Sequence, residues 1–286
     1  MISLFQQWFV PQGCSTGPTQ YVIAAVVALL LTAVGKGGLG GLGALPVPIL
    51  MMVMRPESAT LAVAMWAPML ILCDLTTLPF YAKQCNWRPI LLLAPWTTLG
   101  ILIGRLCLDW FRQNPEAGVW LKVTIGALSI LFALSQGARY YVARRTQTRV
   151  EPWRPVWWHA IPFGLAAGVS TMLAHAAGSI FAMFMIPQQL DRRLFVGTAA
   201  RYYLIFNTLK MPFFMASSPM SNQGSYITWE SLRLILWMIP LVPLGVYSGN
   251  WLNNNFSNRF FNVVVNVLLA LTGVYLVYTN LPWLKG

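Results

Sequence analysis

Charged side chains are scarce in this 286-residue chain. Only 9% of the residues are charged and seven are acidic, whereas 57% are hydrophobic and the mean hydropathy is +0.60. About a quarter of the residues of a soluble domain are charged, so the composition excludes an ordinary soluble protein. Apolar runs of about twenty residues recur along the whole length. They predict an all-α integral membrane protein with no room for a soluble domain.

Histidine and cysteine are also rare. The two histidines and four cysteines show no C-x-x-C or other metal-ligand spacing, so neither a disulfide framework nor a metal site is expected. No catalytic triad, paired carboxylates, phosphate-binding loop or ATP-binding motif is visible, which argues against an enzyme, a cofactor and a self-contained pump. The net charge of +12 resides mostly between apolar runs, so it does not suggest nucleic acid.

The apolar residues form eight blocks. They cover residues 20–54, 57–81, 87–112, 119–142, 157–187, 194–216, 229–253 and 259–279. Six blocks have the length of one membrane crossing. The first and fifth are longer, and each contains a weak point, at residues 35–43 and 175–179. Each long block is therefore expected to be either a re-entrant pair of half-helices or two short spans.

The two halves of the chain resemble each other. The motif LPFY at 78–81 corresponds to MPFF at 211–214, and a G-x-x-x-G motif follows in each half. We therefore predict two repeats, each with a broken or re-entrant block followed by three plain transmembrane helices. The predicted segments are an extracytoplasmic N-terminal segment 1–19, repeats 20–142 and 157–279, a basic cytoplasmic linker 143–156, and a C-terminal tail 280–286. No cleavable signal peptide is expected within residues 1–19.

Basic residues indicate the orientation. If each broken block returns to its starting side, one face carries ten cations: Lys83, Arg88, Arg139, Arg144, Arg145, Arg149, Arg154, Arg192, Arg193 and Arg259. The other face carries five: Arg55, Arg105, Arg112, Lys122 and Lys285. The alternative, in which each block crosses once, gives no such bias. The positive-inside rule therefore favours inverted repeats with both termini outside.

The first break contains Lys36, Gly37 and Gly38. A lysine inside hydrocarbon is costly and glycine weakens a helix. Their coincidence predicts a break where the charge and free backbone N–H groups bind an anion. The alternative is a lysine that reaches the membrane interface, beside glycines that permit close packing.

The second half supplies the other candidate ligands. His175, Gly178 and Ser179 interrupt the fifth block, where a histidine donates a hydrogen bond, relays a proton or is simply structural. In the sixth block, Asn207 and Lys210 share one helix face. Arg201 belongs to another face, shared with Thr208, and is either a ligand or an interface residue.

Asp74 is the acidic counterpart of these cations. It lies in an apolar run between Pro68 and Pro79. A lone buried carboxylate is costly, so Asp74 either carries a coupling proton or pairs with Lys36 or Lys210. Intramembrane cations still outnumber Asp74, which favours an anionic substrate. The two G-x-x-x-G motifs favour packing inside the monomer, and homodimer contacts are the alternative.

Several of these motifs resemble the TauE/SafE family of membrane permeases. They are GKGG at 35–38 with P-x-P at 46–48, HAAG at 175–178, GT at 197–198 and N-x-x-K-x-P at 207–212. The resemblance extends over about residues 20–279. It implies a multi-pass carrier of the bacterial inner membrane that exports sulfite or organosulfonates such as sulfoacetate. The chain departs from the family at residues 170–179, where a second run of glycines is often found.

These observations lead to one expected function. The chain is predicted to be a secondary transporter that exports a small anion, bound near the membrane midplane between the two broken blocks. The anion would contact Lys36, Gly37, Gly38, His175, Gly178, Ser179, Arg201, Asn207 and Lys210. Membrane lipid, a coupling proton and a second copy are the other partners considered. The alternatives are an importer of carboxylates or other anions and a non-transporting assembly or sensor component.

Overall fold

The computed structural model describes residues 14–38, 42–114, 117–145, 153–216, 224–255 and 258–281. Within these ranges the secondary structure is helical, and no strand is found. The α-helices are α2 (Pro18–Gly37), α3 (Pro46–Val53), α4 (Ala59–Thr77), α5 (Trp87–Gln113), α6 (Ala117–Arg145), α7 (Trp157–Ala174), α8 (Ala177–Met185), α9 (Arg192–Met215), α10 (Trp229–Leu236), α11 (Leu241–Asn255) and α12 (Asn258–Asn280). Short 3-10 helices are η1 (Leu42–Ala44), η2 (Pro56–Ser58), η3 (Leu78–Tyr81) and η4 (Ile186–Gln188).

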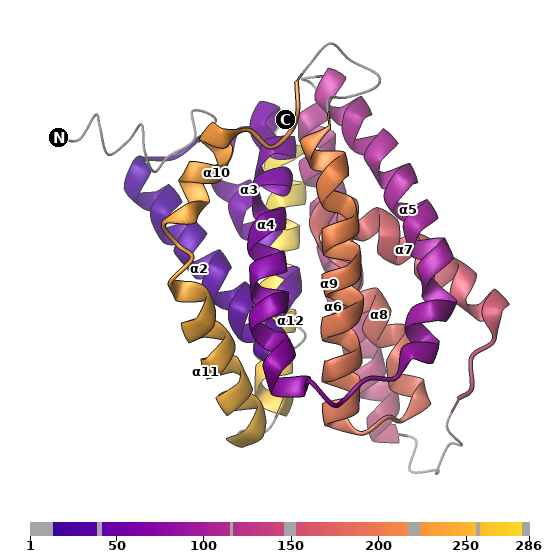
Figure 1. The fold of residues 1–286 in the computed structure, drawn as a ribbon. Helices are drawn as coiled ribbons and strands as arrows, with labels where there is room; N and C mark the ends of the chain where they lie inside the picture. The colour runs from indigo at the N-terminus through magenta and orange to yellow at the C-terminus, as the bar shows by residue number, and fades with distance from the viewer. Residues whose placement is uncertain are drawn as a thin grey trace.

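The helices lie side by side in one bundle (Figure 1). Four stretches of the described chain are long and apolar enough to cross a membrane: Pro18–Gly37, Pro56–Tyr81, Trp87–Gln113 and Ala117–Ala138. Large apolar side chains such as Ile23, Leu91 and Leu131 are exposed on the outside of the bundle, at 58%, 68% and 58%. A lipid-facing surface accounts for them, since they would be a liability in water.

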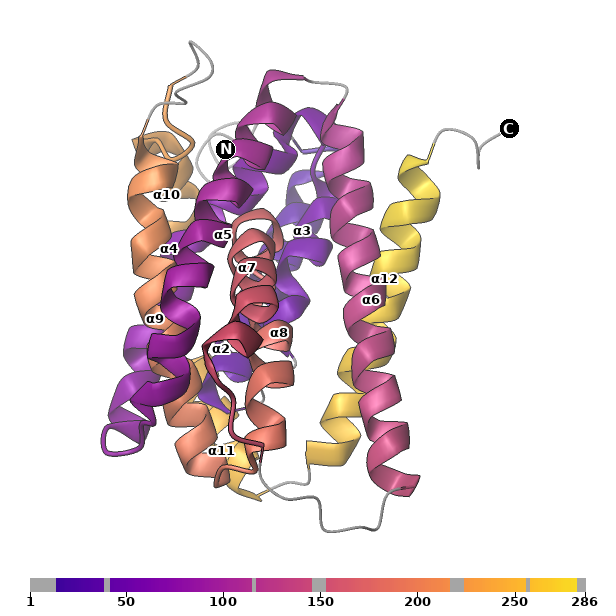
Figure 2. The same ribbon diagram turned by 90° about the vertical axis from the view of Figure 1, so that its right-hand side faces the viewer.

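The two ends of the bundle can be told apart by which helices begin or end there (Figures 1 and 2). We call the end where α2 begins and α12 ends the terminal end. We call the opposite end, where α6 ends and α9 begins, the linker end. Half of the predicted linker 143–156 (residues 146–152) and most of the terminal segments 1–19 and 280–286 lie outside the described residues.

The first broken block turns back on itself. Helix α2 ends at Gly37, and Gly38 has a φ of 151°, which favours glycine. The chain then returns through η1 and α3, which is entered through Pro46 and Pro48. The backbone N–H of Ser15 donates to the Val53 carbonyl at 2.9 Å. The block therefore begins and ends at the same end of the bundle.

The fifth block turns back in the same way. Helix α7 ends at Ala174, the next residue His175 adopts a left-handed conformation with a φ of 53°, and α8 begins at Ala177. The N–H of Trp153 donates to the Pro187 carbonyl at 3.0 Å. The start and end of this block therefore also lie side by side.

The predicted blocks coincide with helical elements, with one correction. Block 229–253 was expected to be a plain helix, but it is divided into α10 and α11. Pro240 lies in the intervening turn, where Met238 and Ile239 donate to carbonyls three residues earlier. Proline supplies no N–H and disfavours a helical residue before it, so the regular helix is interrupted here.

Glycines allow the helices of the two halves to interlock. A Cβ on Gly100 would overlap the Leu165 carbonyl oxygen of α7, and a Cβ on Gly249 would overlap the Val34 carbonyl oxygen of α2. Both G-x-x-x-G motifs are therefore used between helices of the same chain. Helix α5 of the first half packs extensively on α7 of the second, and α11 of the second half packs on α2 of the first.

Candidate functional site

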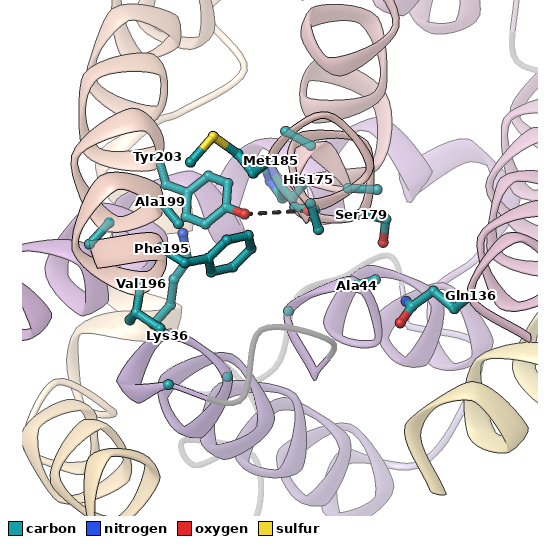
Figure 3. A pocket seen from close by; sticks show the side chains of 18 of the residues that line it. Lys36, Ala44, Gln136, His175, Ser179, Met185, Phe195, Val196, Ala199 and Tyr203 are labelled. Atoms are coloured by element: carbon teal, nitrogen blue, oxygen red, sulfur yellow. Dashed lines mark hydrogen bonds between the residues drawn. The ribbon is translucent and has the colours of Figure 1, made fainter. Parts of the chain in front are cut away.

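The two breaks in the helices border one cavity. Its volume is about 750 Å³, and it is lined by the end of α2, η1, the end of α7, the start of α8 and one face of α9 (Figure 3). Helices α6 and α12 complete the wall with Gln136, Gly137, Val263, Asn266 and Val267. These five residues belong to the linker halves of their helices. The cavity therefore extends from the breaks toward the linker end.

Lys36 presents the cationic group of this cavity. Its Nζ lies 2.7 Å from Asp74 Oδ1 and 4.1 Å from the centroid of the Tyr203 ring. The Lys36 side chain is 11% exposed, whereas that of Asp74 is fully buried in α4. The carboxylate and the ring together compensate the ammonium group for its lost hydration. Lys36 therefore lies at the edge of the cavity, in contact with its buried partner.

Asn207 holds the other oxygen of Asp74. Its Nδ2 donates to Asp74 Oδ2 at 2.6 Å, from α9. Lys36 and Lys210 were the two ion-pair partners predicted for Asp74, and the structure shows the pair with Lys36. Three helices, α2, α4 and α9, are joined by this Lys36–Asp74–Asn207 cluster, so the charge at the cavity wall depends on how the two halves pack.

Lys210, which is fully buried, forms a second cluster. Its Nζ lies 2.7 Å from His175 Nδ1, 3.1 Å from Thr171 Oγ1 and 3.3 Å from the Thr171 carbonyl oxygen. His175 Nε2 lies 2.7 Å from the Val63 carbonyl oxygen. Because a carbonyl only accepts, we assign the hydrogen to Nε2, and Nδ1 then accepts from Lys210. Nζ therefore lies within hydrogen-bond distance of three acceptor atoms.

The start of α8 adds hydrogen-bond donors. Ala177, Gly178 and Ser179 line the cavity, and they form the first turn of the helix. First-turn N–H groups have no partner within their own helix, and they carry the positive end of the helix dipole. The Tyr203 hydroxyl donates to the Gly178 carbonyl at 3.4 Å and ties α9 to this turn (Figure 3).

The predicted site residues are divided by the structure into three groups. Lining the cavity are Lys36, Gly38, His175, Gly178, Ser179 and Asn207. Asp74 and Lys210 are buried behind this wall, in contact with it. Gly37 and Arg201 do not line the cavity. A Cβ on Gly37 would overlap the Val246 carbonyl of α11, so this glycine permits helix packing.

Arg201 fastens a loop. Its guanidinium donates to the carbonyls of Tyr81, Gln84 and Gly197 at 3.2, 2.9 and 3.0 Å, and also to Ala82. Arg201 was a predicted ligand but does not line the cavity, whereas Tyr203 of the same helix does. Tyr203 precedes Asn207 by four residues, so the two side chains share a helix face. This spacing was a visible sequence signal that Tyr203 lies near the site.

A second buried carboxylate escaped the sequence reasoning. Asp109 in α5 is fully buried, accepts from Arg105 Nε at 2.9 Å and accepts from the Tyr226 hydroxyl at 2.6 Å. Its i, i+4 spacing from Arg105 was a visible signal. Because Arg105 compensates it, Asp109 is a structural element near the terminal end and lies away from the cavity.

Basic side chains outnumber acidic ones around the cavity. Lys36 and Lys210 lie at or behind its wall with one carboxylate, Asp74, and the first turn of α8 borders the same space. An anion would balance this excess. Within the described residues no group of three or more histidine, cysteine, aspartate or glutamate side chains gathers to hold a metal ion.

Comparison with known families agrees with this arrangement. The family model "Sulfite exporter TauE/SafE" matches residues 24–276, which include both breaks and every residue of the two clusters. No match to the chain was found among curated proteins or among solved structures. The apolar helices and the family both indicate a multi-pass membrane protein, and the family is one of permeases. The chain therefore belongs to the sulfite exporter TauE/SafE family.

Proposed function

We propose that the protein is a secondary transporter that moves a small anion, sulfite or an organosulfonate such as sulfoacetate, out of the cell across the cytoplasmic membrane. The observation that carries the proposal is the excess of basic over acidic side chains at a cavity bordered by both helix breaks. A sulfonate stays ionised at physiological pH, so it needs fixed donors and a compensating charge.

The chain supplies these groups from both halves. Lys36 gives the charge, and the first-turn N–H groups of Gly178 and Ser179 give donors. His175 and Asn207 line the same cavity, each held by a second residue, Lys210 and Asp74 respectively. Lys210 adds charge from behind the wall. Arg201 and Gly37 position the elements instead of touching the anion.

We also propose that residues 20–142 and 157–279 are inverted repeats. The support is reciprocal packing: α2 of the first half lies on α11 of the second, and α7 of the second lies on α5 of the first. Gly126 of α6 and Gly273 of α12 also face each other, since a Cβ on either would approach the other's carbonyl oxygen to 2.8 or 2.7 Å. A site between such repeats can be exposed to alternate sides by rocking of one against the other.

The linker end is proposed to face the cytoplasm. Exposed cations of this end are Lys83, Arg88, Arg154 and Arg193. At the terminal end, Arg105 and Lys122 are buried against protein partners, which leaves fewer free cations there. The positive-inside rule then places both termini outside. The cavity, which extends toward the linker end, would receive its anion from the cytoplasm.

The test is flux in proteoliposomes. Labelled sulfoacetate and sulfite are supplied to the wild type, to Lys36→Ala and to a matched control, Lys83→Ala, whose side chain is exposed in a loop. We expect saturable flux that is lost in Lys36→Ala and kept in Lys83→Ala. An imposed pH gradient shows whether Asp74 has a coupling role. Absence of flux for both anions in folded protein would contradict the proposal and favour another anion or a non-transporting role.

A further inference from the structure

The cavity is much larger than a sulfite ion. At about 750 Å³ it lies within the range of about 300–1,000 Å³ that encloses drug-sized ligands. A four-atom anion such as sulfite displaces about 60 Å³, roughly two water molecules of about 30 Å³ each. A bare oxyanion at Lys36 would leave most of the space to be filled by something else.

One side of the remaining wall is apolar. From α9 come Phe195, Val196 and Ala199, and α8 adds Met185, on the side of the cavity where Lys36 and Tyr203 also lie (Figure 3). Residues 195, 199 and 203 are four apart, so they form one continuous helix face that leads away from Lys36. These side chains offer no hydrogen bonds to water or to a second polar group.

The geometry points to an amphipathic organic anion as the substrate: its charged group would lie at Lys36, and a body of several carbons would lie along Phe195, Val196, Ala199 and Met185. This inference rests on the proposed anion transport and specifies the class of anion. Burial of the apolar body releases water from both surfaces, which adds affinity that a bare ion cannot obtain. The contact of the charged group with Lys36 selects for anions, and the apolar wall selects among anions by the size of their apolar body.

A chain-length series tests the inference. Binding of sulfite and of methane-, propane- and pentanesulfonate is measured by titration calorimetry on protein in nanodiscs, with the heats from empty nanodiscs subtracted. A buried methylene strengthens binding by about fourfold, so affinity should rise by that order per added carbon until the wall is covered. Neutral pentanol should bind far more weakly than pentanesulfonate, because it lacks the charge that Lys36 compensates.

Two kinds of variant separate the head group from the body. Phe195→Ala should flatten the dependence on chain length, weakening pentanesulfonate far more than methanesulfonate, and Phe195→Leu serves if the alanine variant does not fold. Leu209→Ala, on the exposed face of the same helix, is the matched control and should keep the full dependence. Lys36→Gln should weaken all the sulfonates by a similar factor.

Different failures have different meanings. Affinity that is independent of chain length, or sulfite as the tightest ligand, would overturn the inference and leave anion transport intact. An unchanged chain-length dependence in Phe195→Ala would also overturn it, because the body would then lie elsewhere. If no anion of any length binds to folded wild-type protein, the proposed transport of anions fails as well.

Discussion

Lys36 and Asp74 form an ion pair of 2.7 Å between two helices, α2 and α4, next to the point where α2 ends. The pair explains how a lysine is tolerated inside an apolar block. Its charge is compensated by Asp74, and Asp74 in turn is held by Asn207. The partner is buried and the lysine is partly exposed, so the ammonium group remains available at the cavity wall.

The first prediction concerns the charge balance of this pair. Lys36→Gln leaves Asp74 buried without its cation, and loss of one partner of a buried pair costs about 3–5 kcal/mol of folding free energy. The double variant Lys36→Gln/Asp74→Asn is neutral and should recover most of that stability without recovering transport. Thermal unfolding in detergent and flux assays measure the two properties. Equal melting temperatures for the single and double variants would contradict the pairing.

The second prediction concerns His175. Its left-handed conformation is tolerated by asparagine but strained for a β-branched residue, by about 1–3 kcal/mol. His175→Val should therefore be clearly less stable than His175→Asn, as measured by thermal unfolding. His175→Asn should fold yet transport poorly, since it alters the acceptor of Lys210. Full activity in His175→Asn would show that the ring nitrogen is dispensable.

The third prediction concerns the glycine contacts between the halves. Gly249→Val would force a side chain against the Val34 carbonyl of α2, and overpacking of this kind costs about 1–3 kcal/mol. Gly137→Ala in α6 meets no atom within 4 Å and should stabilise the helix by roughly 0.5–1 kcal/mol. The two melting temperatures should move in opposite directions. A stable Gly249→Val protein would mean that α2 and α11 are not in close contact.

The fourth prediction tests orientation. In a background without native cysteines, Ser15→Cys lies at the terminal end and Lys83→Cys in the loop between η3 and α5, and both positions are exposed. A membrane-impermeant maleimide applied to intact cells should label Ser15→Cys only, and lysis should expose Lys83→Cys. The reverse pattern would place the termini in the cytoplasm and overturn the proposed direction of the cavity.

The fifth prediction concerns native Cys14, just outside α2. Burial raises the pKa of its thiol to about 11, and the nearby Arg55 offsets only part of this effect. Alkylation requires the thiolate, so at pH 8 Cys14 should react on the order of a hundredfold more slowly than an exposed cysteine. The rate should rise about tenfold per pH unit until the pH approaches 11. Fast labelling at neutral pH would show that the segment around Cys14 is open to water.

Much of this molecule was predictable because the relevant signals are local. Long apolar runs predict membrane helices, since backbone groups in lipid must be hydrogen-bonded within the segment. Clustered glycines and a lysine predicted the first break, and the motifs HAAG and N-x-x-K predicted residues that line or support the cavity. Pro240 is a local signal for the interruption between α10 and α11. The continuous apolar run around it nevertheless favoured the prediction of one plain helix.

By itself, the sequence determined the membrane class, the approximate helix bounds, the two breaks and the family. The tertiary structure alone decided that Asp74 pairs with Lys36 instead of Lys210, that Gly38 and not Gly37 lines the cavity, and that Arg201 fastens a loop while Tyr203 takes a place on the wall. The physical reason is that helical periodicity says which residues share a face, whereas ion pairs between helices depend on which faces meet. That choice is made by the close packing of α2 on α11 and of α5 on α7.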